Sequence, residues 1–419
     1  MKKSIIKNTL LFLAVTAFGW QTSAQDLETY LQTAAENNPE IKIAYAEFEA
    51  ALRRSPQVSA LPDPTLSIGA FGRMMQSDMG AEEAKISLMQ MFPWFGTLGA
   101  MEAAANLMAE AKFQEYLNVR AQVFYEVKAA YAEFFLAQKT IELQQENLEI
   151  LETYKELALS GIRSGNASMV SAVKVDIELA AARTGVAVLQ DGLKPLQTDF
   201  NLLLHRGPLE EIVVQDTLVF SALETLSSQE VLAEHPSIQK FEKQKEAYQM
   251  QQEVARKQGL PMLGIGVDYT INSETPSGMP GMNGQDAYMP MVSLSLPIFR
   301  KKYKAAREEA EFLEEVSVHQ QQLQKNELFS SLEKAKYELG TAQKLLDLYE
   351  RQIRSSEQAR ELLLSAFSNS TGNFQEVLDM NQGILLLKMQ QLEALKKGFT
   401  AQARMEYLFS KTSENEKQH

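Results

Sequence analysis

Residues 260–269 read LPMLGIGVDY, and residues 61–70 read LPDPTLSIGA. Each stretch opens with a Leu-Pro pair and continues with apolar side chains that alternate with small or polar ones. Alternation with a period of two is typical of a half-buried β-strand. A second alternating run follows each stretch, at residues 85–92 and 292–296. We therefore expect two β-hairpins, at about residues 64–92 and 262–296.

The chain repeats itself around these hairpins. Four landmarks recur in the same order at offsets between 197 and 207: Asn38-Pro39 with His235-Pro236, Leu61-Pro62 with Leu260-Pro261, Met91-Phe92-Pro93 with Leu296-Pro297-Ile298, and Gly165-Asn166 with Gly372-Asn373. A unit of about half the chain is too long for a solenoid repeat. The sequence predicts two copies of one unit, at residues 25–227 and 228–419, of which the second ends in a polar C-terminal tail.

Helical stretches flank each hairpin, at about 26–60 and 228–258 before it and at about 99–161 and 302–367 after it. In the first long stretch Phe124, Val127 and Tyr131 recur at steps of three and four residues, which is typical of coiled coils. A helix of that length spans ~95 Å and needs comparable helices beside it. A Gly-Asn pair interrupts each long stretch, and both residue types tolerate a left-handed backbone. We expect helical turns at residues 163–168 and 370–374.

The first 24 residues are typical of a secretory signal peptide. Lys2, Lys3 and Lys7 precede an apolar run that ends at Trp20, and residues 22–24 supply the small side chains of a cleavage site. A membrane anchor is the alternative, but the run is short for a spanning helix. No later stretch approaches 18 uninterrupted apolar residues, so we expect any contact with a membrane to be made as a β-barrel or along a surface.

The composition argues against several classes of function. The 419 residues include no cysteine, and 41 basic against 54 acidic side chains give a net charge of −13. The lack of cysteine excludes disulfides, a cysteine nucleophile and a Cys-ligated zinc site. The negative charge disfavours nucleic acid as a partner. With scattered histidines and no nucleotide-binding motif, we expect no enzymatic activity, no cofactor and no metal site.

The hairpins have the features of membrane strands. Each run is about as long as a transmembrane strand and has one apolar face. Four strands cannot close a barrel, and an open edge is not viable in hydrocarbon, so such a barrel must be shared between chains. Aromatic side chains follow the hairpins as a membrane-interface girdle requires: Phe92, Trp94, Phe95, Phe299 and Tyr303. Two surface hairpins with buried packing aromatics are the alternative.

The order of elements, given twice, resembles the TolC family of outer-membrane efflux ducts. The segments that carry the resemblance are residues 294–299 (LSLPIF), 367–379 (FSNSTGNFQEVLD) and 165–173 (GNASMVSAV). Residues 61–64 (LPDP) with 90–96 (QMFPWFG) are similar to the heavy-metal-efflux branch of that family, which is CusC/CzcC-like.

The resemblance implies a mainly α fold with a membrane β-barrel contribution. Three chains of four strands each would form a homotrimeric 12-stranded β-barrel, continued by a long periplasmic α-helical barrel. Such a protein lies in the lipid of the outer membrane and is a passive duct. A periplasmic adaptor docks on it, and an inner-membrane efflux pump supplies the energy. Heavy-metal cations are the expected substrate, and drugs or small organic molecules are the alternative. A periplasmic coiled-coil adaptor is a further alternative, but it would carry its hairpin once.

The resemblance also assigns residues. The adaptor-docking tips are Arg163, Ser164, Gly165, Asn166 and Ser168 in the first half, and Ser370, Thr371, Gly372, Asn373 and Phe374 in the second. The aperture is assigned to Glu376 and Asp379, which lie three apart on one helix face. Three copies would form a ring of six carboxylates, which favours cations and responds to pH. The first half has Ser171 where the family has an acid. Plain turns and a solvated helix face are the alternatives.

Methionines are concentrated around the hairpins. Ten of the 18 fall in residues 63–93 and 261–297. Thioethers suit soft ions such as Cu(I) and Ag(I). Methionine is also an adaptable filler of apolar space, and we adopt that more ordinary interpretation at this point.

Overall fold

The computed structural model describes residues 27–77, 79–165, 167–221, 232–276, 278–369 and 372–410. The expected signal peptide lies outside the described residues. The chain divides into two compact units. The first unit comprises Met1–Pro39, Gln122–Glu224 and Leu332–Tyr407, and the second comprises Glu40–Ala121, Thr225–Ser331 and Leu408–His419.

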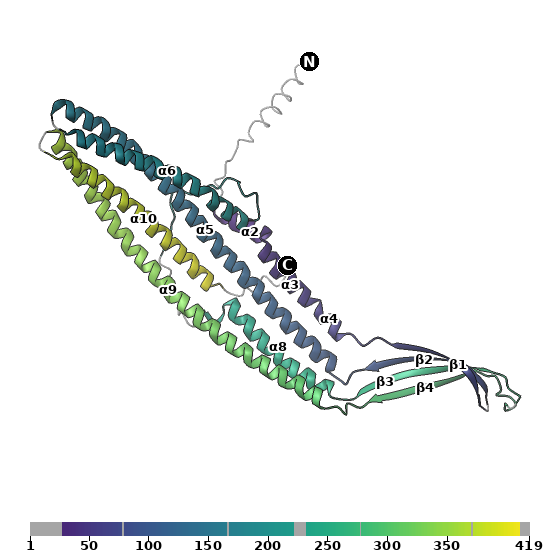
Figure 1. Ribbon diagram of the computed structural model, residues 1–419. Helices are drawn as coiled ribbons and strands as arrows, with labels where there is room; N and C mark the ends of the chain where they lie inside the picture. Colours follow the sequence, from purple (N-terminus) through teal and green to yellow (C-terminus); the bar gives the residue numbers. More distant parts are fainter. Residues whose placement is uncertain are drawn as a thin grey trace, which may run out of the picture. The chain divides into compact units, whose positions relative to one another are not determined.

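The described elements alternate between helices and strand pairs (Figure 1). In chain order they are α2 (Leu27–Asn37), α3 (Pro39–Leu52), α4 (Arg54–Ser59), β1 (Thr65–Ser77), β2 (Gly80–Phe92), α5 (Thr97–Ser164), α6 (Met169–Leu203), α8 (Pro236–Gln258), β3 (Met262–Ser273), β4 (Ala287–Ser295), α9 (Lys301–Ser368) and α10 (Phe374–Leu408). The mainly α fold with four strands, expected from the sequence, is confirmed.

The helices that follow the hairpins have equal lengths in the two halves. Helices α5 and α9 each contain 68 residues, and α6 and α10 each contain 35. The offset is 204 residues at the start of the long helices and 205 at the start of the helices that follow them. The expected pairing of Gly165-Asn166 with Gly372-Asn373 is therefore wrong. Residues 167–168 occupy the place of residues 372–373, because the second turn is one residue longer than the first.

The first helical stretch is broken, although the sequence predicted continuous helix over about residues 26–60. Helix α2 ends before Asn38, whose backbone N–H donates to Ala34 O at 2.9 Å. Pro39 begins α3, where its missing N–H is no loss, and proline disfavours a helical backbone at the residue before it. The side-chain amide of Asn38 instead donates to Leu203 O at 2.9 Å, which ties this break to the end of α6.

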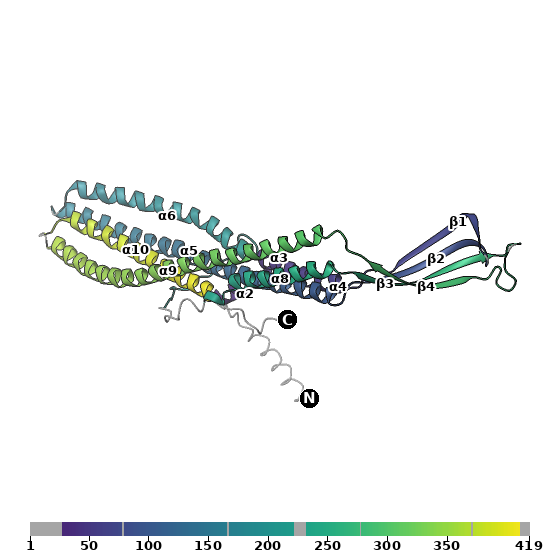
Figure 2. The same ribbon diagram turned by 90° about the horizontal axis from the view of Figure 1, so that it is seen from below.

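In the first unit, parts of α5 and α9 run beside α6 and α10 (Figure 2). These helices pack around a core of apolar side chains, and they also share a buried amide pair. Asn381 Nδ2 donates to Asn147 Oδ1 at 2.9 Å, and both residues are less than a tenth exposed. A single buried Asn pair between helices fixes their register, because any shift leaves an amide without a partner.

In the second unit, a charged network joins three helices. Lys112 on α5 donates to Glu47 on α3 at 2.7 Å and to Glu115 on α5 at 2.9 Å, and Lys240 on α8 donates to Glu115 at 2.9 Å. Burial alone would raise the pKa of Glu115, but the hydrogen bonds from Lys112 and Lys240 outweigh it and lower that pKa below its ordinary value. The network therefore keeps Glu115 ionised.

The second unit also holds an antiparallel four-stranded sheet in the order β1-β2-β3-β4. The register places Leu66, Leu88 and Val267 in one row across the first three strands. Side chains on this face are apolar and exposed: Leu66, Ile68, Leu88, Ile265, Val267, Tyr288, Val292 and Leu294. The other face carries Lys85, Ser87 and Asp268, where Lys85 forms an ion pair with Asp268 and Ser87 Oγ donates to it at 2.5 Å. The alternation that predicted the strands thus sorts their side chains into an apolar and a polar face.

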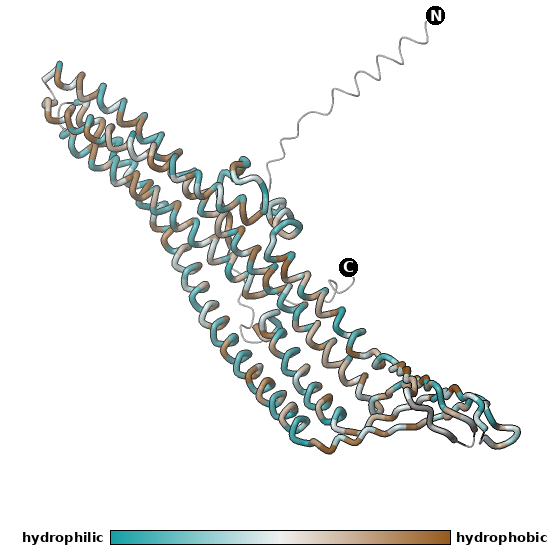
Figure 3. Tube along the Cα trace, turned by 45° about the vertical axis from the view of Figure 1, so that its right-hand side comes forward, coloured by the Kyte–Doolittle hydropathy of each residue, from teal (hydrophilic) through white to brown (hydrophobic). Residues whose placement is uncertain are grey.

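Among the described helices, none has an apolar stretch long enough to cross a membrane. Figure 3 shows why, since hydrophilic and hydrophobic residues interleave along them.

Candidate functional site

The first turn, between α5 and α6, is closed by backbone hydrogen bonds and a cap. Gly165 has φ +79°, a left-handed backbone that glycine adopts without strain. Ala167 N–H donates to Gly161 O at 3.1 Å, which closes the end of α5. The Ser168 hydroxyl accepts from Ser171 N–H and caps α6. Arg163, Ser164, Gly165 and Ser168 are exposed, and Asn166 lies outside the described residues.

The second turn, between α9 and α10, has the same closing bond but a different glycine. Gly372 N–H donates to Ala366 O at 3.1 Å, and Asn373 Oδ1 caps α10 by accepting from Gln375 N–H at 3.0 Å. A Cβ at Gly372 would lie 2.8 Å from Phe367 N, so the position requires glycine for close approach of the backbone. Ser370 and Thr371 lie outside the described residues.

An apolar core lies beneath the two turns. It is built by α5, α6, α9 and α10 around Tyr154, Phe367 and Phe374. Phe374 is only 2% exposed and packs on Phe367 with ring centroids 5.1 Å apart. The assignment of Phe374 as a docking residue is therefore wrong for its side chain, because the apolar ring is satisfied in the core. Gly161 makes the packing close, since a Cβ there would lie 3.1 Å from Phe367 Cζ.

The acidic pair lies in the first two turns of α10, with Glu376 in the first and Asp379 in the second. Glu376 and Asp379 are both exposed and line an open groove of about 710 Å³ with Leu362, Leu363 and Met380. Leu362 is 72% exposed, which leaves an apolar side chain in solvent beside two carboxylates. The pair thus lies on an exposed face of this chain, and its role at an aperture stays a prediction.

The ammonium group of Lys174 is linked to the acidic pair through the side-chain amide of Gln375. Lys174 on α6 donates to Gln375 Oε1 at 2.6 Å, and Gln375 Nε2 donates to Asp379 Oδ1 at 2.5 Å. The sequence reasoning missed Lys174 and Gln375. At the offset of 205, Lys174 is the counterpart of Asp379 and Ser171 that of Glu376, so a correct alignment of the halves would have identified Lys174. The first half carries no acid at these two positions.

The aromatic residues expected at a membrane interface fall into two groups. Trp94, Phe95 and Phe299 are exposed, at 43%, 84% and 79% respectively. Phe92 and Tyr303 are half-buried, and Lys302 Nζ lies 4.7 Å from the Tyr303 ring centroid. The exposed group follows directly on β2 and β4, where aromatic rings could lie at the level of lipid headgroups.

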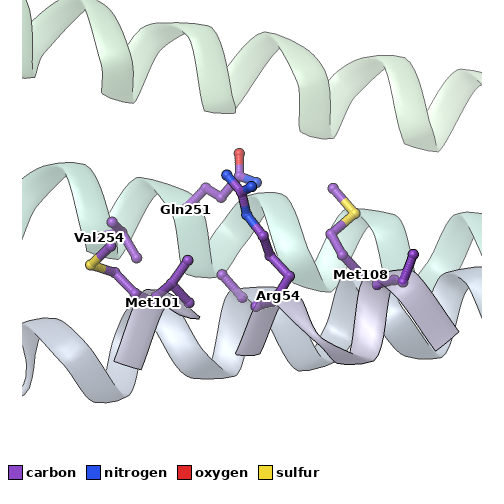
Figure 4. Close-up of a pocket in the computed structure, with 10 residues that line it drawn as sticks. Arg54, Met101, Met108, Gln251 and Val254 are labelled. Carbon is purple, nitrogen blue, oxygen red and sulfur yellow. The ribbon is translucent and has the colours of Figure 1, made fainter. Parts of the chain in front are cut away.

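A second groove lies in the second unit, between α3, α4, α5 and α8. It has a volume of about 390 Å³ and small apolar walls, and Arg54 extends over it toward Gln251 (Figure 4). Met101, Met108 and Val254 complete the labelled lining. The groove thus holds one guanidinium group, from Arg54, and one amide, from Gln251, among mostly aliphatic side chains. This is not a catalytic arrangement.

Within the described part of the chain, no three His, Cys, Asp or Glu residues gather in a way that could hold a metal ion. His235 is buried and caps α8, where its Nδ1 accepts from Ser237 N–H at 3.2 Å. A structural role therefore accounts for that histidine.

Together, the paired strands, the two long helices and their capped turns define a mainly helical protein built from two similar halves. The outer membrane efflux protein family matches residues 30–194 and 227–408. The chain belongs to this family, and it is a protein of the outer membrane. The resemblance to the TolC family is confirmed, and the expectation of no enzymatic activity agrees with a family of efflux proteins.

Solved structures show the same fold at low sequence identity. CusC has a TM-score of 0.77 at 16% identity, over 93% of this chain and 92% of its own. VceC from Vibrio cholerae has a TM-score of 0.73 at 16% identity, over 92% and 96% respectively. The open state of the MtrE outer membrane channel from Neisseria gonorrhoeae has 0.74 at 16% identity, over 91% and 88%. No curated protein matches the sequence.

Proposed function

We propose that three copies of this chain form a passive efflux duct that crosses the outer membrane and extends into the periplasm. The observation that carries the proposal is the sheet, which has one apolar exposed face and edge strands β1 and β4. An edge with unpaired backbone groups is not viable in hydrocarbon. Pairing of β1 with β4 of the next copy closes the sheet, and three copies of four strands give a 12-stranded barrel, within the range of membrane barrels.

The helices form the periplasmic part of the duct. A helix of 68 residues, the length of α5 and α9, spans about 100 Å. The halves at residues 25–227 and 228–419 act as two copies of one unit, so a trimer presents six helical turns. A periplasmic adaptor docks on the exposed turn residues, and an inner-membrane pump supplies the energy.

The substrate we propose is a heavy-metal cation. Its support is the similarity of residues 61–64 and 90–96 to the heavy-metal-efflux branch. The acidic pair Glu376 and Asp379, present three times in a trimer, would favour cations at the aperture. Drugs and small organic molecules are the second candidate, because the fold is shared across the family.

Cross-linking tests the trimer, since the chain contains no cysteine. We would introduce Ser67→Cys on β1 and Ser293→Cys on β4 and treat purified protein with a flexible bismaleimide. The expected products are covalent dimers and trimers that stop at three, because the ring closes.

The two single variants are the controls. Neither should give a cross-linked product, because β1 of one copy lies beside β4 of the next and not beside another β1. A monomer alone in the double variant, or a ladder that continues beyond three chains, would refute the closed trimer.

A further inference from the structure

Methionine side chains cover two glycines on the polar face of the sheet. Met89 and Met91 of β2 extend over Gly264 and Gly266 of the neighbouring strand β3. A Cβ at Gly264 would lie 2.6 Å from Met91 Sδ and 3.1 Å from Met89 Sδ. A Cβ at Gly266 would lie 3.1 Å from Met89 Sδ. Because glycine has no Cβ, Gly264 and Gly266 leave the space in which the two thioethers converge. Any other residue would place a Cβ in that space.

A hydroxyl group joins the two sulfurs from a third strand. Ser293 Oγ of β4 lies 3.6 Å from Met89 Sδ and 3.7 Å from Met91 Sδ. A Cβ at Gly264 would lie 2.1 Å from the same oxygen. Two sulfurs and one oxygen, supplied by β2 and β4, therefore surround one point above β3.

The register extends the cluster along β4. Met291 lies opposite Gly266, and Met289 lies opposite Asp268 in the next row. Side chains in one row of an antiparallel sheet share a face. With Met262 of β3, which lies opposite Ser295, five of the ten methionines counted around the hairpins belong to one face, a placement that the sequence count did not predict.

We propose that Met89, Met91 and Ser293 form a weak binding site for a soft monovalent cation, Cu(I) or Ag(I). Soft thioether sulfurs favour these ions over hard cations such as Mg²⁺ or Ca²⁺. The donors are neutral and few, which suits a single positive charge. They also suit fast release, because conduction requires binding that is weak enough for the ion to leave the site. Met291 supplies a neighbouring thioether to which an ion can pass.

The position of the site in the pore rests on the proposed function, whereas binding of the ion does not. If the apolar face of the sheet meets lipid, the face with Met89 and Met91 lines the duct. A trimer would then hold three such sites in a ring. This deepens the proposed function by naming the class of cation.

The test measures Ag(I) binding to the purified full-length chain in detergent. Silver nitrate in chloride-free buffer is the probe, and equilibrium dialysis with elemental analysis is the readout. The variant Met89→Leu with Met91→Leu keeps the apolar volume but removes both sulfurs. We expect its affinity for Ag(I) to fall about ten-fold or more.

The matched control is Met279→Leu with Met282→Leu, two methionines of the β3–β4 loop that are 54% and 50% exposed. We expect this control to bind Ag(I) as the wild type does. Failure of the wild type to bind Ag(I), or an equal loss in both double variants, would overturn the site. The single variant Met91→Leu is a second measure, and an unchanged affinity there would also overturn it.

Single-channel current in planar bilayers separates the two proposals. Normal currents from all variants show that they fold and assemble, so a loss of Ag(I) binding then belongs to the site. Absence of any current from the wild type would count against the duct and leave the Ag(I) measurement intact.

Discussion

Glu376 and Asp379 owe their proposed role to the side chains around them. Both carboxylates are exposed on α10, while the neighbouring Phe374 is buried and holds the start of the helix against the core. Asp379 also accepts from Gln375, which in turn accepts from Lys174. At this scale the structure separates side chains that can meet a partner or an ion from those that support the turn.

The acidic pair can be tested by removing its charge. We expect Glu376→Gln with Asp379→Asn to lower cation selectivity and weaken block by multivalent cations, because a ring of carboxylates attracts cations. The measurement is the reversal potential and the block of single-channel current in a planar bilayer.

The matched control is Glu308→Gln with Glu311→Gln, an exposed pair on α9 with the same spacing. It removes the same charge away from the aperture, so selectivity should change little. If the two double variants shift the reversal potential equally, Glu376 and Asp379 are not the aperture.

The helices end at turns that look alike in sequence but are built differently. Gly165 is needed for its left-handed backbone, whereas Gly372 is needed because the backbone at Phe367 leaves no room for a Cβ. Both turns nevertheless close with the same bond across six residues and continue into capped helices of equal length. The repeated element is thus conserved in its hydrogen bonds rather than in the position of its glycine.

Docking at the first turn can be tested at Arg163. Its guanidinium is exposed and donates only within its own helix, to Leu159 O at 3.4 Å among the contacts described. Arg163→Glu should therefore leave the duct assembled but reduce efflux, because a reversed charge opposes a partner that fits the turn. The measurement is metal resistance restored to a deletion strain, with the assembled protein quantified in outer-membrane fractions.

Arg351→Glu is the control, since Arg351 is also exposed and donates to the carbonyl four residues earlier, Asp347 O at 3.0 Å. It lies on α9, 17 residues before the helix ends at Ser368 and the second turn begins. Full resistance with Arg163→Glu, or equal losses in both variants, would contradict docking at the first turn.

For the whole molecule, the proposed duct needs more than one polypeptide. The sheet has two edges, and its apolar face lies in solvent in the single chain. Exposed apolar patches of this kind mark surfaces that meet lipid or another chain. Membership of the outer membrane efflux protein family agrees with a surface that meets lipid or another chain.

Loss of the whole protein tests the substrate. We expect a deletion strain to become more sensitive to silver and copper ions than to lipophilic drugs, because the substrate that we propose for the duct is a metal cation. Minimal inhibitory concentrations measured with and without the gene on a plasmid give the comparison. Greater sensitivity to drugs than to metals would move the protein to the drug-exporting branch.

Local sequence patterns were enough to predict the elements, because periodicity and proline placement act within one segment of the chain. Alternation around Gly264 and Gly266 predicted the strands, and the steps of three and four residues predicted the long helices. The duplication and the family followed from the order of these elements. Such signals arise from which side chains face in and out along one element, so no long-range contact is needed to detect them.

The contacts between side chains of different elements became visible in the folded chain. It placed Met89 and Met91 beside Ser293, buried Phe374 under the turns, linked Lys174 to Gln375 and corrected the alignment of the two turns. These pairings depend on strand register and on helix packing between segments about 200 residues apart in the chain. A sequence pattern states the period of each element but not the register between two of them, and that register fixes which side chains touch.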